Sequence, residues 1–324
     1  MTIKMEDRLI NSPLISVVIC SYNRAELLAD VLQSVCEQTV DAAVYEVIIV
    51  DNNSADNTPQ ISQTFANRYT NIRYCVETAQ GLSHARNRGW QEARGAYVAY
   101  VDDDCKVPEG WLAAAAAIID QFRPTVFGGP YFAFFNTPKP YWYKPSYGSH
   151  EPFDSADFID TLHDLHGGNL FVQRGKLVAV NGFDPDFGMT GNTLAYGEEN
   201  ELLERIRKQF PASTFYYDPA LFVYHLVRPE KLSWRRLAEE RFKSGRAGYH
   251  ILHHNRSSQT TLQATLAIGK KGMRILYSVT GGLLLRPRQT FPHVQNYLYE
   301  ETARQITALG WLYGQFEHKR GQAR

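Results

Sequence analysis

The chain has 324 residues, of which 44% are hydrophobic and 21% charged, a composition typical of a soluble globular protein with a sizeable core. Its formal net charge of +0 combines 17 Lys+Arg and 28 Asp+Glu in residues 1–225 with 17 Lys+Arg and 6 Asp+Glu in residues 226–324. The basic part has no RNA-binding or zinc-finger signature, so we expect no nucleic-acid partner. Acidic residues interrupt the amino-terminal segment, and the four cysteines have no paired metal spacing. We therefore expect a cytoplasmic protein with reduced thiols.

The first hundred residues alternate between two kinds of pattern. Short apolar runs rich in β-branched residues predict strands at residues 14–20, 44–50, 72–76 and 97–101. Helical spacing of apolar residues, or a proline suited to a first turn, predicts helices at residues 25–38, from Thr58 onward, and at residues 82–93. Because strands that alternate with helices need crossover connections, the pattern predicts an α/β fold with a mostly parallel sheet flanked by helices.

The second half is less regular. Residues 127–158 form a loop-rich stretch with many aromatic residues. One of them, Trp142, is a candidate for stacking on a sugar ring, although such residues more often only pack a loop. Regular structure is predicted at residues 169–173, 175–180, 198–209 and 213–217. After residue 225 the chain reads as helical, with a flexible break at residues 253–259.

Polar residues follow three of the predicted strands. They are Ser21-Tyr22-Asn23 after the first strand, Asp51 after the second, and Asp102-Asp103-Asp104 after the fourth. Ligands of open α/β sheets bind at the carboxyl ends of the strands. Unpaired buried carboxylates are costly, and a hard divalent cation that also holds phosphates is their natural partner. The alternative is a solvated acidic turn. Neither a Gly-x-Gly-x-x-Gly fingerprint nor a Walker lysine loop is present, which disfavours dinucleotide dehydrogenases and P-loop kinases.

These runs belong to an ordered series that continues along the chain. It comprises Val17-Val18-Ile19-Cys20-Ser21-Tyr22-Asn23-Arg24, Val50-Asp51-Asn52-Asn53-Ser54, Gly81-Leu82-Ser83-His84-Ala85-Arg86-Asn87-Arg88-Gly89, Val101-Asp102-Asp103-Asp104, Gly167-Gly168-Asn169, Gly182-Phe183-Asp184, Gly197-Glu198-Glu199-Asn200-Glu201-Leu202 and Val223-Tyr224-His225. The series resembles the family 2 glycosyltransferases, which have the Rossmann-like GT-A fold. The resemblance implies a nucleotide-sugar-binding catalytic domain at residues 1–225, followed by a basic helical region at residues 226–324 that could contact a membrane surface or the acceptor.

The resemblance also implies roles for the polar strand ends. Members of this family bind a nucleotide-diphosphate sugar, usually with Mn²⁺ or Mg²⁺. Asp51 matches the carboxylate that accepts a hydrogen bond from the base, and Ser21, Tyr22 and Asn23 are expected to bind the nucleotide with it. Asp102 and Asp104 form the D-x-D pair, with Asp104 as direct metal ligand, while Asp103 is expected to face the ribose. His225 matches a position where some members place a histidine metal ligand, and imidazole tolerates Mn²⁺ better than Mg²⁺.

Two further groups of residues match the donor site and the catalytic base. Arg86 matches an arginine near the nucleotide and metal, and Gly168 and Asn169 fall where the family brings backbone close to the sugar phosphate. Inverting transfer needs a carboxylate that takes the proton from the acceptor hydroxyl. The family usually reads Glu-Asp where this chain has Glu198-Glu199, so Glu199 is the expected base and Glu198 the alternative.

The expected function is therefore inverting transfer of a sugar, from a UDP-sugar in the first instance, to a hydroxyl of a saccharide or a lipid-linked acceptor. Polysaccharide or glycoconjugate biosynthesis is the expected setting. A nucleotidyltransferase and a non-catalytic binding partner with the same fold are the alternatives. The basic region at residues 226–324 fits peripheral contact with anionic lipids at the inner face of the plasma membrane, but a solvated helical surface would have the same composition.

Overall fold

The computed structural model describes residues 12–160, 164–190, 196–252 and 261–322. The chain divides into two compact units. The first unit contains residues 1–132, 149–186 and 198–225, and the second contains residues 133–148, 187–197 and 226–324. Residue 225 is thus one point of division, and two shorter segments of the expected catalytic domain belong to the second unit.

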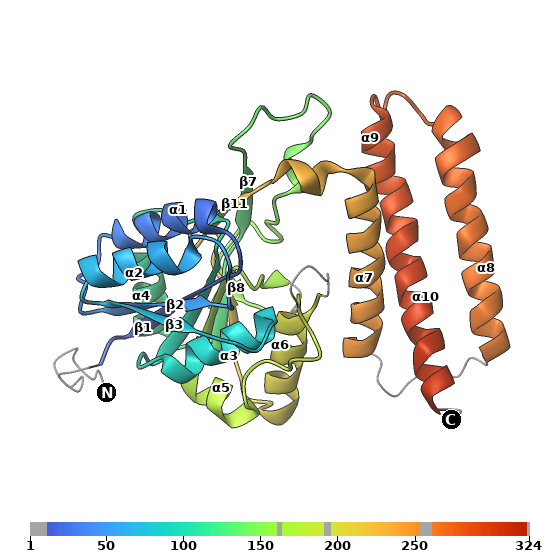
Figure 1. Ribbon diagram of the computed structural model, residues 1–324. Coiled ribbons are helices and arrows are strands. Elements are labelled where there is room, and N and C mark those ends of the chain that lie inside the picture. Colours follow the sequence, from blue (N-terminus) through green and yellow to red (C-terminus); the bar gives the residue numbers. More distant parts are fainter. Residues whose placement is uncertain (1–11, 161–163, 191–195, 253–260, 323–324) are drawn as a thin grey trace. The chain divides into compact units, whose positions relative to one another are not determined.

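The first unit is built on an eight-stranded sheet (Figure 1). Its strands, in spatial order, are β3 (Ile72–Val76), β2 (Tyr45–Asp51), β1 (Ile15–Ser21), β4 (Tyr97–Asp102), β9 (Asn169–Gln173), β6 (Val126–Gly128), β10 (Phe215–Tyr217) and β8 (Asp157–Phe158). The first four run parallel, β9 is antiparallel to both its neighbours, and β8 is antiparallel to β10. The predicted mostly parallel sheet is confirmed.

The described residues of the first unit also form six α-helices: α1 (Ala25–Cys36), α2 (Thr58–Arg68), α3 (Leu82–Glu92), α4 (Trp111–Phe122), α5 (Arg174–Val180) and α6 (Glu198–Gln209). They pack on the two faces of the sheet, because successive side chains of a strand point to opposite sides. Val17 belongs to the core shared with α1, α2 and α4, whereas Val18 belongs to the core shared with α3, α5 and α6. This double burial explains why the central strands are continuous apolar runs.

A short ladder places the last strand of this unit beside the aspartate loop. The strand β11 (Val223–Leu226) is antiparallel to β5 (Cys105–Lys106), with His225 paired to Cys105. The sequence predicted neither β5 nor α4, which follows the aspartates, nor β7 (Tyr131–Phe134) inside the aromatic stretch. The predicted strand at residues 213–217 is shorter in the structure and begins at Phe215.

The second unit is mainly helical. Its helices are α7 (Trp234–Leu252), α8 (Thr261–Tyr277), α9 (Val294–Tyr297) and α10 (Ala303–Gln322), with π-helical turns at Ser278–Gly282 and Leu298–Thr302. In Figure 1, α10 lies between α7 and α8. Glycine allows the backbones of α7 and α10 to approach closely, since a Cβ at Gly245 would collide with the Thr307 carbonyl. The predicted break at residues 253–259 lies outside the described residues. None of the described helices has the length and apolar character needed to cross a membrane.

Candidate active site

The polar strand ends meet at one edge of the sheet, because their strands are parallel neighbours. Ser21 at the end of β1 pairs in register with Asp51 of β2, and Cys20 pairs with Asp102 of β4. Asp51 and Ser21 are buried, whereas Asp102 retains 28% of its side-chain exposure. The register of the parallel strands therefore brings these polar residues together at one edge of the sheet.

Asp103 is buried at this edge of the sheet. One carboxylate oxygen accepts a hydrogen bond from the Ser21 hydroxyl at 2.9 Å, and the other accepts one from the Arg24 guanidinium at 2.6 Å. Burial raises the pKa of the Asp103 carboxyl to about 6, with Arg24 opposing and Asp104 reinforcing the shift. Both oxygens accept hydrogen bonds within the protein, which fixes the position of Asp103, and its expected contact with the ribose stays a prediction.

Arg24 is a site residue that the sequence analysis quoted but did not assign. Its guanidinium also lies 3.5 Å from Asp104, so it neutralises two members of the triplet. Burial would lower the pKa of this arginine, but the aspartates raise it above its ordinary value. The sequence did contain a signal for this role of Arg24: a basic residue comes directly after one strand, and an acidic loop follows the adjacent strand.

Asp104, Asp102 and His225 form the one group of metal-ligand type found among the described residues. Each offers a ligand atom, and these atoms all lie within 4.8 Å of one another. Asp104 is buried, with one carboxylate oxygen 3.3 Å from Nε2 of His225. The β5–β11 ladder holds this histidine in place. Two carboxylates and one imidazole form a hard-to-borderline donor set that suits Mn²⁺ and tolerates Mg²⁺.

Arg86, on α3, connects the aspartate loop to α6. Its guanidinium donates to Glu198 at 2.9 Å, to Asp102 at 3.1 Å and to the Gly167 carbonyl at 3.3 Å. The side chain is only 3% exposed. Burial would lower the pKa of this guanidinium, but Glu198 and Asp102 raise it above its ordinary value. Arg86 is therefore a buried arginine that pairs with two carboxylates.

The two glutamates at the start of α6 differ in their surroundings. Glu198 is buried and committed to Arg86. Glu199 is half-buried and accepts a hydrogen bond from the Asn200 side chain at 3.3 Å. Burial, followed by repulsion from Glu198, raises the pKa of Glu199 to about 8, while Arg86 opposes the shift. Glu199 is therefore a carboxylate with an elevated proton affinity, and among the described residues it accepts its hydrogen bond from a neutral amide.

Asp51 lies at the end of β2. Its carboxylate accepts hydrogen bonds from the Ser54 amide at 2.9 Å and the Tyr74 hydroxyl at 3.2 Å. Burial and the charge of Asp51 raise the pKa of Tyr74 to about 12, so the phenol stays a donor. Because an ionised carboxylate offers about four acceptor positions, Asp51 keeps capacity for a base N–H.

The loop that follows β1 is fixed by Asn23. This residue has a positive φ of 51° and is exposed. Its side chain accepts from the Ala55 amide at 2.7 Å, which ties the loop after β1 to the loop after β2. Tyr22 beside it is half-buried. The structure thus gives Asn23 a loop-bracing role, and its contact with a nucleotide stays a prediction.

The two glycines before β9 allow close packing beside the carboxylates. A Cβ at Gly168 would lie 2.6 Å from a carboxylate oxygen of Asp102, and one at Gly167 would lie 2.9 Å from the Arg86 guanidinium. Asn169 is fully buried. Its amide donates to the Leu221 carbonyl at 2.7 Å and accepts from the Trp111 indole at 3.0 Å. The side chain of Asn169 therefore joins strands in the interior, and the expected approach of its backbone to the sugar phosphate stays a prediction.

His166, which precedes these glycines, was missed by the sequence analysis. Its Nδ1 accepts from the Gly168 amide at 3.2 Å, and its ring centroid lies 6.2 Å from that of His225. Burial lowers the pKa of His166 to about 4, with Asp102 opposing and His225 reinforcing the shift. A neutral imidazole therefore lines the same cluster.

Trp142 belongs to the second unit. Its indole packs against Tyr143, Tyr147 and Tyr299, and the Asn296 amide donates to its backbone carbonyl at 2.7 Å. These contacts are those of a packed aromatic cluster within that unit. A sugar contact by Trp142 stays a prediction.

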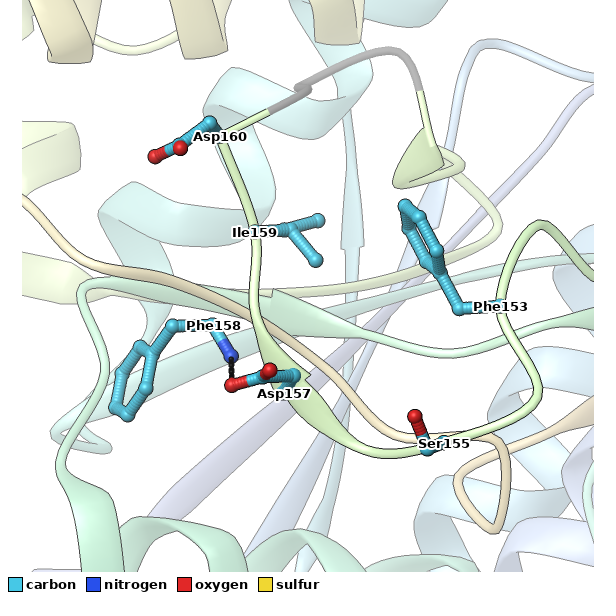
Figure 2. Close-up of a pocket in the computed structure, with 6 residues that line it drawn as sticks. All are labelled: Phe153, Ser155, Asp157, Phe158, Ile159 and Asp160. Carbon is cyan, nitrogen blue, oxygen red and sulfur yellow. Dashed lines mark hydrogen bonds between the residues drawn. The ribbon is translucent and has the colours of Figure 1, made fainter.

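A surface pocket of about 270 Å³ lies elsewhere in the first unit (Figure 2). It is lined by Phe153, Ser155, Asp157, Phe158, Ile159 and Asp160 around the edge strand β8. The Asp157 carboxylate in it accepts a hydrogen bond from the Phe158 amide at 2.7 Å. None of its lining residues belongs to the carboxylate cluster, and the site chemistry described above does not involve it.

The chain is similar to known glycosyltransferases. A model of the family described as Glycosyl transferase family 2 matches residues 16–178. Glycosyltransferase AglE of Haloferax volcanii is 28% identical over 240 residues, which cover 74% of each chain. Poly(ribitol-phosphate) beta-N-acetylglucosaminyltransferase TarS of Staphylococcus aureus is 31% identical over 112 residues, which cover 34% of this chain and 20% of TarS.

Solved structures show the same fold. Mannosyltransferase PcManGT from Pyrobaculum calidifontis, in complex with GDP-Man and Mn²⁺, has a TM-score of 0.57 at 18% identity, covering 93% of this chain and 88% of that one. S. aureus TarS 1-349 in complex with UDP has a TM-score of 0.53 at 17% identity, covering 93% and 91%. The chain belongs to the family 2 glycosyltransferases and has the GT-A fold, as the sequence predicted.

Proposed function

We propose that this protein is a metal-dependent, inverting glycosyltransferase that moves a sugar from a UDP-sugar to a hydroxyl of a saccharide or a lipid-linked acceptor. The observation that carries the proposal is the continuous arrangement of Asp102, Arg86 and Glu198, which links the D-x-D loop to the glutamate pair. Family membership removes the support for a nucleotidyltransferase.

The ligand atoms of Asp104, Asp102 and His225 form a set that fits a divalent cation. Two carboxylates and an imidazole within reach of one another match the oxygen and nitrogen ligands that Mn²⁺ accepts. A bound cation would offset the negative charge that develops on the leaving diphosphate. The structural neighbour that holds GDP-Man and Mn²⁺ supports this part of the proposal.

Asp51 and the residues around it are proposed to hold the nucleotide. The carboxylate accepts but cannot donate, so it selects bases with a ring N–H, as in uracil, thymine and guanine. TarS in complex with UDP supports a uridine donor. PcManGT in complex with GDP-Man supports the wider class of nucleotide sugars.

Glu199 is proposed as the base that takes the proton from the acceptor hydroxyl as its oxygen attacks the anomeric carbon. A general base works best with a pKa near the working pH, and burial has brought the pKa of Glu199 to about 8. Glu198 is paired with Arg86 at 2.9 Å, so its carboxylate is less available to the acceptor hydroxyl. Arg86 thereby engages one of the two adjacent carboxylates and leaves the other for the proton of the acceptor.

The acceptor class rests on the relatives. One of them is the glucosyl-dolichyl phosphate glucuronosyltransferase of Haloferax volcanii, 24% identical over 207 residues, and its name describes transfer to a lipid-linked sugar. TarS, by its name, acts on poly(ribitol phosphate). The expected cytoplasmic location belongs to the same proposal, and the free state of all four cysteines supports it.

A donor screen tests the proposal. Purified protein is incubated with UDP-, GDP- and dTDP-sugars in the presence and absence of Mn²⁺, and the nucleotide products are separated by ion-exchange chromatography. Slow, Mn²⁺-dependent release of UDP from a UDP-sugar is the expected result, since water can replace the acceptor. Release of pyrophosphate would indicate nucleotidyl transfer instead. Turnover of no donor, with or without candidate acceptors, would favour the non-catalytic alternative.

A further inference from the structure

The helix α8 presents large apolar side chains to solvent. Those of Leu262, Leu266, Met273 and Tyr277 are 70%, 57%, 66% and 59% exposed. They follow one another at intervals of four, seven and four residues, which places them on one side of a helix. Leu276, 62% exposed, lies next to them. We call these five residues the α8 face.

The opposite side of α8 is packed against α10. Ala264 is fully buried, and Lys271 donates to the Gln305 side chain at 3.0 Å. The Ser278 and Thr302 hydroxyls, just beyond the end of α8, lie 2.6 Å apart. The α8 face therefore points away from its own unit's core. A Cβ added at Gly269, on the same side, would meet no atom within 4 Å.

The charge around the α8 face has one sign. Residues 261–288 contain five basic residues and no acidic one. Lys270 and Arg274 are exposed on the margin of the face. After the π-helical turn that follows α8 come Leu284 and Leu285, which are 82% and 75% exposed, and the chain then reads Arg286-Pro287-Arg288. Apolar and basic surface are thus combined along the whole segment.

We propose that the α8 face binds the surface of an anionic lipid bilayer, with α8 lying in the interface. A helix with an apolar side bordered by Lys and Arg has the composition of such interfacial helices. Each basic residue near the surface strengthens the attraction to anionic head groups. A second copy of the chain is a poorer occupant, because it would bring two uniformly basic margins together. Binding of this kind does not depend on the proposed sugar transfer, although it would place the enzyme beside lipid-linked acceptors.

The electrostatic part is tested by flotation with vesicles. Wild-type protein is mixed with vesicles of equal parts phosphatidylglycerol and phosphatidylcholine, and separately with pure phosphatidylcholine, at low salt. Binding to the anionic vesicles alone is expected. The double variant Lys270→Glu/Arg274→Glu should bind about 25-fold more weakly, from about fivefold for each basic residue lost. Arg304→Glu, at a residue 72% exposed on α10, is the control and should change binding much less.

The apolar part needs a second pair of variants. Leu266→Ser/Met273→Ser should weaken vesicle binding by about tenfold for each side chain removed from the interface. The control is Tyr141→Ser/Val178→Ser, two residues that are 79% and 53% exposed outside α8. Circular dichroism and donor hydrolysis in solution should be unchanged in all four variants, which separates this test from that of the transferase.

Three results would overturn the proposal. The first is a wild-type protein that ignores anionic vesicles. The second is vesicle binding that both α8 pairs of substitutions leave intact. The third is a concentration-dependent dimer, without vesicle binding, that the Leu266→Ser/Met273→Ser variant dissociates, since this would assign the α8 face to a second copy.

Discussion

Arg86 offers the strongest test of how the site is held together, and the change we consider is Arg86→Met. The guanidinium is 3% exposed and donates to Glu198 at 2.9 Å and to Asp102 at 3.1 Å. Hydrogen bonds to charged groups contribute about 1.5–3 kcal/mol each. The Asp102 bond belongs to the lower end of that range, because this carboxylate is 28% exposed. Removal of one partner of a buried pair lowers the free energy of unfolding by about 3–5 kcal/mol, and we expect Arg86→Met to lower it by this amount.

A matched control lies on α6, the helix that carries Glu198. Arg207 pairs with Glu204 on α6 at 2.7 Å, but its side chain is 49% exposed. Arg207→Met should therefore cost no more than about 1 kcal/mol. The double variant Arg86→Met/Glu198→Met should be less destabilised than the sum of its single changes, by about 1–3 kcal/mol, because no buried glutamate is left without its partner.

Amide hydrogen exchange of peptides from β1 and β4, followed by mass spectrometry at increasing urea, measures the opening free energy of the first unit. Peptides from the second unit provide an internal reference. If Arg86→Met cost no more than Arg207→Met, the buried guanidinium would not be what fixes the D-x-D loop to the glutamate pair. Pairing with Arg86 could then not explain why the two glutamates are proposed to have different roles.

Three further predictions concern the chemistry. The kcat/KM for transfer should rise with pH through about 8 and then level, because Glu199, whose pKa is about 8, must be unprotonated to accept a proton; a pH–rate profile of the free enzyme measures this, and a flat profile from pH 6 to 9 would contradict it. Asp104→Ala should abolish Mn²⁺-dependent binding of UDP in calorimetry, whereas Asp120→Ala, at an exposed position of α4, should leave it intact. Gly168→Ala should weaken Mn²⁺ binding by displacing the carboxylate 2.6 Å from the added Cβ, while Gly175→Ala, where a Cβ meets no atom within 4 Å, should not.

The central part of the sheet could be predicted from the sequence because two local signals agreed. The runs of β-branched residues marked β1, β2 and β4, and the polar residues directly after them marked one edge of a parallel sheet. Helix α4 was missed although its run of alanines has a high helix propensity. Its apolar residues are scarcely interrupted by polar ones, so the segment lacks the polar-apolar period that marks an amphipathic helix.

Contacts between distant side chains could not be predicted. Arg86 meets Asp102 and Glu198, which are 16 and 112 residues away in the chain, and no local pattern encodes such a triple contact. The side-chain amide of Asn169 turns into the interior at the start of β9, where it contacts Trp111, and the residues around it in the sequence do not indicate this contact. The orientation of a side chain at a strand end depends on its tertiary neighbours, which a single sequence does not specify.

The central claim is that Glu199 takes the acceptor proton while the neighbouring residues only hold the donor. Its most direct test is to compare Glu199→Gln with Glu204→Gln, a change of the same kind on the same helix, in initial transfer rate and in UDP affinity. Glu199→Gln should keep wild-type affinity for UDP with Mn²⁺ and lose at least about a hundredfold in kcat, while Glu204→Gln should keep both. A Glu199→Gln variant that transfers sugar at the wild-type rate would contradict the claim.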